Sequence, residues 1–122
     1  MPHKVLIVDD AMFMRAMIRD ILVNSGHYEV VGEASNGEEA VGQYQSLNPD
    51  VVSMDIVMPQ MDGIEACREI LKDHPKARII MCSALGQEAL VIESIAAGAK
   101  DFIVKPFSAE KVLKVFDSVM AE

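Results

Sequence analysis

Residues 51–59 read VVSMDIVMP, a mostly apolar stretch into which a single carboxylate, Asp55, is set. Burying an ionised carboxylate is costly unless the group is paired or serves a purpose. The run Val51–Met54 does not alternate between apolar and polar residues, which is typical of a parallel strand covered on both faces. The stretch therefore predicts a buried strand that ends at a candidate functional residue.

Further strands and helices are predicted on both sides of this stretch. Four more runs have strand length: VLIV at Val5–Val8, VVGEA starting at Val30, IIMC at Ile79–Cys82 and FIV at Phe102–Val104. The first helical stretch carries an apolar stripe at the i, i+3, i+4, i+7 spacing, which predicts a core-facing side. That stripe comprises Met14, Met17, Ile18, Ile21 and Leu22. The other predicted helices are Asn36–Leu47, Gly63–Asp73, Gln87–Ala97 and Ala109–Met120.

The regular alternation of strands and helices predicts the fold class. A strand, a helix and two loops need about 24 residues, and five such units need about 120. The 122 residues are therefore expected to form one α/β domain over residues 1–122, with five βα units in a doubly wound parallel sheet. The chain ends two residues after the fifth predicted helix, so no effector domain is expected.

Composition and charge exclude several classes of protein. Apolar residues make up 51% and charged residues 25%, which is ordinary globular composition. Eleven basic against nineteen acidic residues give a net charge of −8, which argues against nucleic acid or an anionic membrane as a direct partner. No signal peptide or membrane-spanning stretch is recognisable. Two cysteines without a CxxC motif indicate a reduced, cytoplasmic protein.

Polar residues follow four of the five predicted strands. Asp9 and Asp10 come after the first strand, Asp55 after the third, Ser83 after the fourth and Lys105 after the fifth. In doubly wound folds, ligands bind beyond the carboxyl ends of the strands. These side chains are therefore expected to meet at one edge of the sheet. The alternative for Asp9 and Asp10 is that they cap the first helix.

Three neighbouring carboxylates point to a cation and to phosphoryl chemistry. Each pair at about 4 Å repels by roughly 4 kcal/mol at an effective dielectric constant near 20. One lysine cannot neutralise three negative charges, whereas a hard divalent cation can, and ligands that are all oxygen favour Mg²⁺. One carboxylate can then act as a nucleophile toward a phosphoryl group, while Lys105 and Ser83 bind the phosphoryl oxygens.

Four segments carry a resemblance to a known family: VLIVDDAMFMR, DVVSMDIVMPQMDGIEA, IIMCSALGQ and GAKDFIVKPF. They are spread over residues 5–107, and together they resemble the receiver domain of two-component response regulators. Within that family the chain is most similar to the stand-alone chemotaxis regulators. The resemblance implies a flavodoxin-like strand order, 2-1-3-4-5.

The resemblance also implies a role for each residue at the predicted edge. Asp55 matches the phosphoacceptor. Asp10 matches the direct Mg²⁺ ligand, Asp9 a ligand acting through a metal-bound water, and the backbone carbonyl of Val57 the third protein ligand. Lys105 matches the phosphate-binding lysine, and its peptide bond to Pro106 is expected to be cis.

A switch and its partners are implied as well. Ser83 matches the switch hydroxyl and Phe102 the switch aromatic, where some relatives carry Tyr. Both are expected to change the face formed by the fourth helix, the fifth strand and the fifth helix. The implied partners are a CheA-like histidine kinase, a flagellar motor switch protein and a separate phosphatase, acting on a monomer. The protein would be a signalling module that catalyses only its own phosphoryl transfer and slow dephosphorylation.

Helical geometry assigns a side to each apolar residue of the fourth helix. At 100° per residue, Ile92, Ile95 and Ala96 share one face, which we expect to be the core face. Leu90 then points outward and is expected to contact a partner.

Val57 and Leu85 stand where several relatives carry polar side chains near the phosphoryl group. Because apolar groups cannot orient an attacking water, we expect slow spontaneous dephosphorylation.

Three alternative functions require other sequence features or another setting. A phosphatase of the haloacid dehalogenase type needs a DxD pair with the nucleophile after the first strand, whereas Asp9 and Asp10 are adjacent. A flavodoxin-like electron carrier needs a Ser/Thr/Gly-rich phosphate loop there, and DDAMFMR is not one. The third alternative is a receiver domain of another or longer response regulator with a different output.

Overall fold

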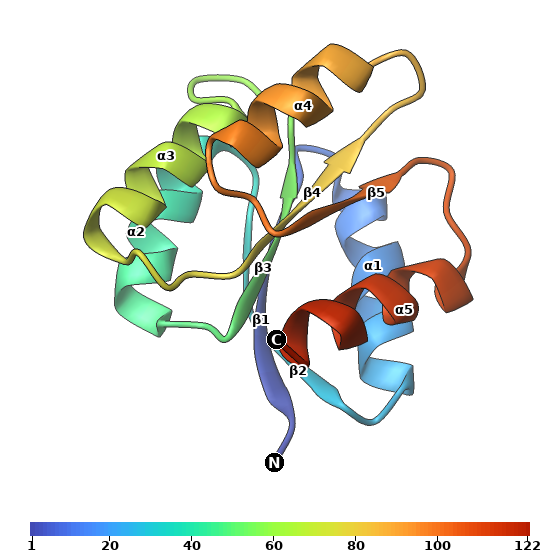
Figure 1. Ribbon diagram of the computed structural model, residues 1–122. Helices are drawn as coiled ribbons and strands as arrows, with labels where there is room; N and C mark the ends of the chain where they lie inside the picture. The colour runs from blue at the N-terminus through green and yellow to red at the C-terminus, as the bar shows by residue number, and fades with distance from the viewer.

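The computed structural model describes all 122 residues as five strands that alternate with five helices (Figure 1). The strands are β1 His3–Val8, β2 Tyr28–Ala34, β3 Val51–Asp55, β4 Ile79–Ser83 and β5 Asp101–Val104. The helices are α1 Met12–Asn24, α2 Gly37–Leu47, α3 Gly63–Asp73, α4 Glu88–Ala96 and α5 Ala109–Met120. None of these helices is long and apolar enough to cross a membrane.

The sheet is parallel throughout, in the order β2-β1-β3-β4-β5. This confirms the predicted α/β class and the flavodoxin-like strand order. Helices α2, α3 and α4 cover one face, and α1 and α5 cover the other (Figure 1). Parallel strands require crossover connections, and the right-handed preference of these connections explains why the two helical layers form.

The central strands are buried on both faces, which explains their continuous apolar runs. In β1, Leu6 and Val8 pack in the core beneath α2 and α3, whereas Val5 and Ile7 pack against α1 and α5. Side chains alternate between the faces of a strand, so a strand with a core on each side needs apolar residues at every position. The sequence pattern identified these strands for that reason.

Short polar side chains begin three of the helices. Asn36, Asp62 and Ser108 each accept a hydrogen bond from the backbone N–H three residues later, at 2.9, 2.9 and 3.1 Å. These contacts satisfy backbone donors that a helix leaves free in its first turn. Helix α1 has no such side-chain cap, and its N-cap residue is Ala11. The loops before α2, α3 and α5 are therefore fixed by local sequence, whereas the start of α1 depends on other contacts.

The face of helix α4 that packs against the core is the opposite of the predicted one. Ile92 is 71% exposed and Ile95 is 43% exposed, and Ala96 is exposed as well. Leu90 instead packs against the core, and Ser94 is fully buried. The Ser94 hydroxyl donates a hydrogen bond to the Leu90 carbonyl at 2.8 Å, so the serine is satisfied within its own helix and can be buried.

The prediction that Leu90 points outward is therefore wrong, and Ile92 and Ile95 are the exposed isoleucines of α4. The helix is apolar on nearly every side, so a comparison of apolar faces selects no single inward side. The core position predicted for Met17 is also wrong. Met17 is exposed on α1 beside Met12 and Phe13, while Ile18 and Leu22 carry the burial of that helix.

Candidate functional site

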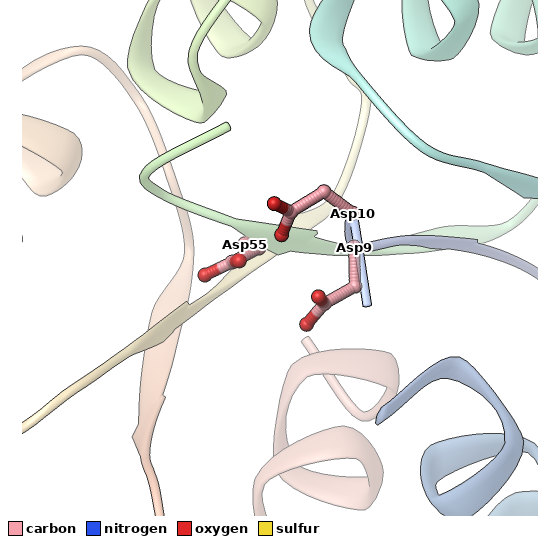
Figure 2. A group of neighbouring side chains, drawn as sticks. All are labelled: Asp9, Asp10 and Asp55. Carbon is pink, nitrogen blue, oxygen red and sulfur yellow. The ribbon is translucent and has the colours of Figure 1, made fainter. Parts of the chain in front are cut away.

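The carboxyl ends of β1, β3, β4 and β5 bring the predicted polar residues to one edge of the sheet. Asp9 directly follows β1, Asp55 and Ser83 are the last residues of β3 and β4, and Lys105 directly follows β5. The carboxylates of Asp9, Asp10 and Asp55 each offer an oxygen within 4.8 Å of the other two. Figure 2 shows these three side chains gathered beyond the strand ends.

Lys105 links two of the three carboxylates. Its Nζ atom lies 3.1 Å from Asp9 Oδ2 and 3.3 Å from Asp55 Oδ1. Its peptide bond to Pro106 is cis, as predicted, and its backbone N–H donates to the Ser83 carbonyl at 2.7 Å. One ammonium group therefore partly offsets the repulsion between Asp9 and Asp55.

Every polar atom of Asp9 takes part in a hydrogen bond. Its N–H donates to the Ala34 carbonyl at 3.0 Å, and its Oδ1 accepts from the Ala11 N–H at 2.9 Å. Its carbonyl accepts from Arg15 at 2.6 Å and its Oδ2 from Lys105 at 3.1 Å. Asp9 therefore fixes the turn that leads into α1 and belongs to the acidic cluster, but the capping alternative is wrong for it, because no side chain caps α1.

Asp10 differs from its neighbour. Its side chain is exposed, and no hydrogen bond or ion pair of the chain involves it. Its carboxylate still lies within reach of Asp9 and Asp55. The helix-capping alternative is therefore wrong for Asp10, whose carboxylate faces the cluster and solvent (Figure 2).

The surroundings of Asp55 make its ionisation costly. Burial, and next the charge of Asp9, raise the pKa of Asp55 to about 6, although Lys105 acts in the opposite direction. Burial alone would lower the pKa of Lys105, but the charges of Asp55 and Asp9 prevail and raise it. Lys105 therefore stays charged, and Asp55 is a buried carboxylate that gains from any further positive charge.

Ser83 lies beside this cluster with an unused hydroxyl. The residue is buried, and its Oγ has no hydrogen-bond partner in the chain. A buried hydroxyl without a partner costs free energy, so its position calls for an explanation. A phosphoryl oxygen placed on Asp55 would provide an acceptor for it.

Two glycines hold the loop between β3 and α3. The Gly63 N–H donates to the Ile56 carbonyl at 2.6 Å, and the Gly37 N–H donates to the Met61 carbonyl at 2.9 Å. A Cβ atom at Gly63 would collide with the Asp55 carbonyl oxygen, and one at Gly37 with the Met61 carbonyl. The loop that carries Val57 is thus fixed at both ends, and the sequence offered only the presence of glycine as a signal.

An apolar groove adjoins the acidic edge between α4 and β5. Its lining includes Ser83, Leu85, Val91, Ile92, Ile95 and Phe102. Phe102 is 38% exposed, so its ring is neither buried nor fully in solvent. Ser83 both lines this groove and ends the strand next to β3, so one residue borders the two regions.

The match to known families excludes two of the alternative functions. Residues 5–117 match the model of the response regulator receiver domain. The chain belongs to this family. As a receiver domain it is a signalling module rather than a classical enzyme, and the haloacid dehalogenase and flavodoxin alternatives are wrong.

Similar receiver domains of known role cover almost the whole chain. The chemotaxis protein CheY of Thermotoga maritima is 59% identical over 119 residues, 98% of both chains. The CheY of Bacillus subtilis is 58% identical over 120 residues, 98% of this chain and 99% of its own length. These matches confirm the resemblance to stand-alone chemotaxis regulators.

A solved structure confirms the receiver fold. A chain from the CheX–CheY–BeF₃–Mg²⁺ complex of Borrelia burgdorferi superimposes with a TM-score of 0.93 at 43% identity, covering 100% of this chain and 92% of that one.

Proposed function

We propose that this receiver domain is a chemotaxis response regulator that a histidine kinase phosphorylates on Asp55. The observation that carries the proposal is the position of Lys105, whose ammonium group contacts Asp9 and Asp55 at the carboxyl edge of the sheet. Asp55 belongs to that cluster and ends β3, the middle strand of the sheet. The high similarity to CheY proteins over nearly the full length supports the chemotaxis setting.

The acidic cluster suits a magnesium ion. Its donors are all oxygens, as Mg²⁺ prefers, and Asp9, Asp10, Asp55 and the carbonyl of Val57 would hold the ion. Bound magnesium would supply positive charge that offsets the carboxylates and the phosphoryl oxygens.

The residues of the chain perform the transfer itself. The ionised Asp55 carboxylate attacks the phosphorus atom, a phosphorus–oxygen bond forms, and the bond from phosphorus to the donor imidazole nitrogen breaks. The electron pair of that bond leaves with the imidazole, and Asp55 becomes an acyl phosphate. Lys105 then donates to one phosphoryl oxygen and Ser83 to another, as charge-assisted hydrogen bonds.

The same step would drive the switch. The Ser83 hydroxyl moves toward the phosphoryl group, and Phe102 turns into the space beside it in the α4–β5 groove. Moving an equilibrium from 1:99 to 99:1 takes about 5.5 kcal/mol of differential stabilisation. The remodelled face of α4, β5 and α5 would then bind a flagellar motor switch protein.

The chain would act as a monomer with its receiver domain over residues 1–122, in the cytoplasm, where its two buried free thiols stay reduced. A separate phosphatase would end the signal, because exposed Val57 and Leu85 offer no hydrogen bond to an attacking water. The CheX–CheY complex of the similar structure supports a partner of this kind.

Intact mass after incubation with acetyl phosphate and magnesium tests the proposed function. The wild-type protein should gain one phosphoryl group, and the gain should vanish in the Asp55→Asn variant and in the presence of a chelator. Asp62→Asn is the matched control, because Asp62 caps α3 and lies outside the acidic cluster. An unmodified wild-type protein, or a modified Asp55→Asn variant, would contradict the proposal.

A further inference from the structure

Arg15 contacts the backbone of the acidic cluster from the first turn of α1. Its Nη1 donates to the Asp9 carbonyl at 2.6 Å, and its Nε donates to Glu33 Oε1 at 3.1 Å. The side chain is only 14% exposed. We propose that Arg15 is a positioning residue for the magnesium site, acting through the peptide bond between Asp9 and Asp10. This inference rests on the proposed function, because it assumes that the acidic cluster binds Mg²⁺.

Arg15 can influence Asp10 because the carbonyl that it binds lies directly before Asp10 in the chain. The Asp9 carbonyl belongs to the peptide unit that leads into Asp10, so its orientation sets the direction in which Asp10 leaves the strand. The Asp10 side chain has no partner of its own in the chain. The backbone therefore sets the direction from which the Asp10 carboxylate reaches the cluster, and Arg15 is the side chain that holds that backbone.

Arg15 is itself oriented by a fixed carboxylate. Glu33 lies in β2, and its Oε2 accepts a second hydrogen bond from Arg19 Nη1 at 2.8 Å. The Glu33 carbonyl accepts from Gln43 Nε2 at 2.8 Å. Because the guanidinium is a planar fork, one bond to Glu33 and one to the Asp9 carbonyl define its plane. A lysine has no such fork and cannot reproduce both contacts in this geometry.

The chain offers a matched control for a purely structural role. Arg19 also lies on α1 and also donates to Glu33, but it makes no contact with Asp9. Loss of either arginine removes one ion pair to the same carboxylate. Only the loss of Arg15 frees the Asp9–Asp10 peptide unit.

The test compares Mg²⁺ binding by wild type, Arg15→Met and Arg19→Met, measured by isothermal titration calorimetry with magnesium chloride at neutral pH. Partners that orient metal ligands typically contribute a factor of about 10 to 100 in metal affinity, so Arg15→Met should bind Mg²⁺ about tenfold more weakly. Arg19→Met should stay within about twofold of wild type, as expected for an exposed ion pair. Thermal unfolding without metal reports the structural effect of each substitution separately.

A second readout separates positioning from damage to the chemistry. At saturating Mg²⁺, Arg15→Met should accept a phosphoryl group from acetyl phosphate at close to the wild-type rate, because only the metal affinity is weakened. If Arg15→Met fails to fold, Arg15→Lys and Arg19→Lys replace the methionine pair, and the lysine at position 15 should bind Mg²⁺ several-fold more weakly than that at position 19.

Each result separates the inference from the proposed function. If the wild-type protein binds Mg²⁺ and the Arg15 and Arg19 variants bind it with the same affinity as each other, the inference is overturned and the proposed function stands. If both Arg15 variants fail to fold while the Arg19 variants fold, the inference is also overturned, because Arg15 is then required for folding. Absence of Mg²⁺ binding in the wild-type protein would overturn both.

Discussion

The acidic edge of the sheet and the α4–β5 groove lie side by side, yet they are held in different ways. At the edge, Asp9 has each polar atom in a hydrogen bond, and Lys105 connects it to Asp55. In the groove, Ile92, Ile95 and Phe102 are exposed apolar side chains without polar contacts of their own. Directional bonds fix the first region, whereas the second keeps freedom to repack.

This difference suits the two tasks of a receiver domain. Phosphoryl transfer needs groups held in one geometry, because the free energy of ordering them is then spent on folding rather than on the reaction. A partner-binding face that responds to a signal needs at least two arrangements of similar free energy. Ser83 borders both regions, and the proposed switch would connect them through its unpaired hydroxyl.

The largest expected effect on stability comes from the burial of the Asp55 carboxylate and its repulsion by Asp9. Burial and Asp9 raise the pKa of Asp55 from 3.8 to about 6, so the folded state holds a proton through a pH range in which the unfolded state has lost it. The stability of the metal-free protein therefore falls as the pH rises through that range, and the full penalty applies above it. This rise in the pKa of Asp55 corresponds to about 3 kcal/mol, and because solvent screens part of it, Asp55→Asn should raise the free energy of unfolding by about 2 kcal/mol near pH 8.

Urea denaturation in the presence of a chelator checks this value at several pH values. The gain should shrink as the pH falls below the pKa of Asp55, because the protonated carboxyl and the amide are then both neutral. A gain that is independent of pH would show that charge at Asp55 is not its cause.

The next effect separates the two sides of α4. Leu90→Ala should lower the free energy of unfolding by about 2 kcal/mol, because Leu90 packs against the core. Ile92→Ala should change it by less than about 0.5 kcal/mol, since Ile92 is exposed. Binding to the motor switch partner should weaken in Ile92→Ala. Equal stability losses in the two variants would contradict the orientation of the helix.

A smaller effect concerns the lifetime of the phosphorylated edge. Val57→Asn would place a polar side chain beside the phosphoryl group, where it orients an attacking water. One hydrogen bond of about 1 kcal/mol corresponds to an increase in dephosphorylation of somewhat less than about tenfold. Phosphate release after removal of acetyl phosphate measures it. A wild-type half-life of seconds would contradict the expected slow dephosphorylation.

The smallest effect is at the border of the two regions. Ser83→Ala removes a buried hydroxyl that has no partner in the chain, so it should stabilise the unphosphorylated protein by about 1 kcal/mol. Urea denaturation of both proteins gives the difference, and a loss of stability would show that the hydroxyl is satisfied before phosphorylation. The same variant should still be phosphorylated but should switch less completely.

The sequence predicted the acidic edge well and the groove poorly, for a physical reason. Strands buried on both faces leave continuous apolar runs, so a charged residue at the end of one, such as Asp55, stands out. Parallel topology then brings all strand ends to one edge without any knowledge of side-chain contacts. The position and the members of the acidic cluster were therefore accessible from the order of residues along the chain.

Other features depend on contacts that the order of residues does not encode. Helix α4 is apolar nearly all round, and a serine that bonds within its own helix takes the buried position, so Leu90 and Ile92 exchanged their expected places. Arg15 and Gly37 were missed because an arginine or a glycine near a helix start is common. Only the tertiary fold shows which carbonyl each one holds.

The central claim is that the acidic edge and the α4–β5 groove are coupled. Methyl NMR of the isoleucines, with and without beryllofluoride and magnesium as a phosphoryl mimic, tests this coupling most directly. The δ1 methyl groups of Ile92 and Ile95 should shift together with residues at the acidic edge, whereas Ile18, buried on the opposite face of the sheet, should not. The shifts should be absent in Asp55→Asn. Shifts confined to the acidic edge, with the groove unchanged, would contradict the coupling of the two regions.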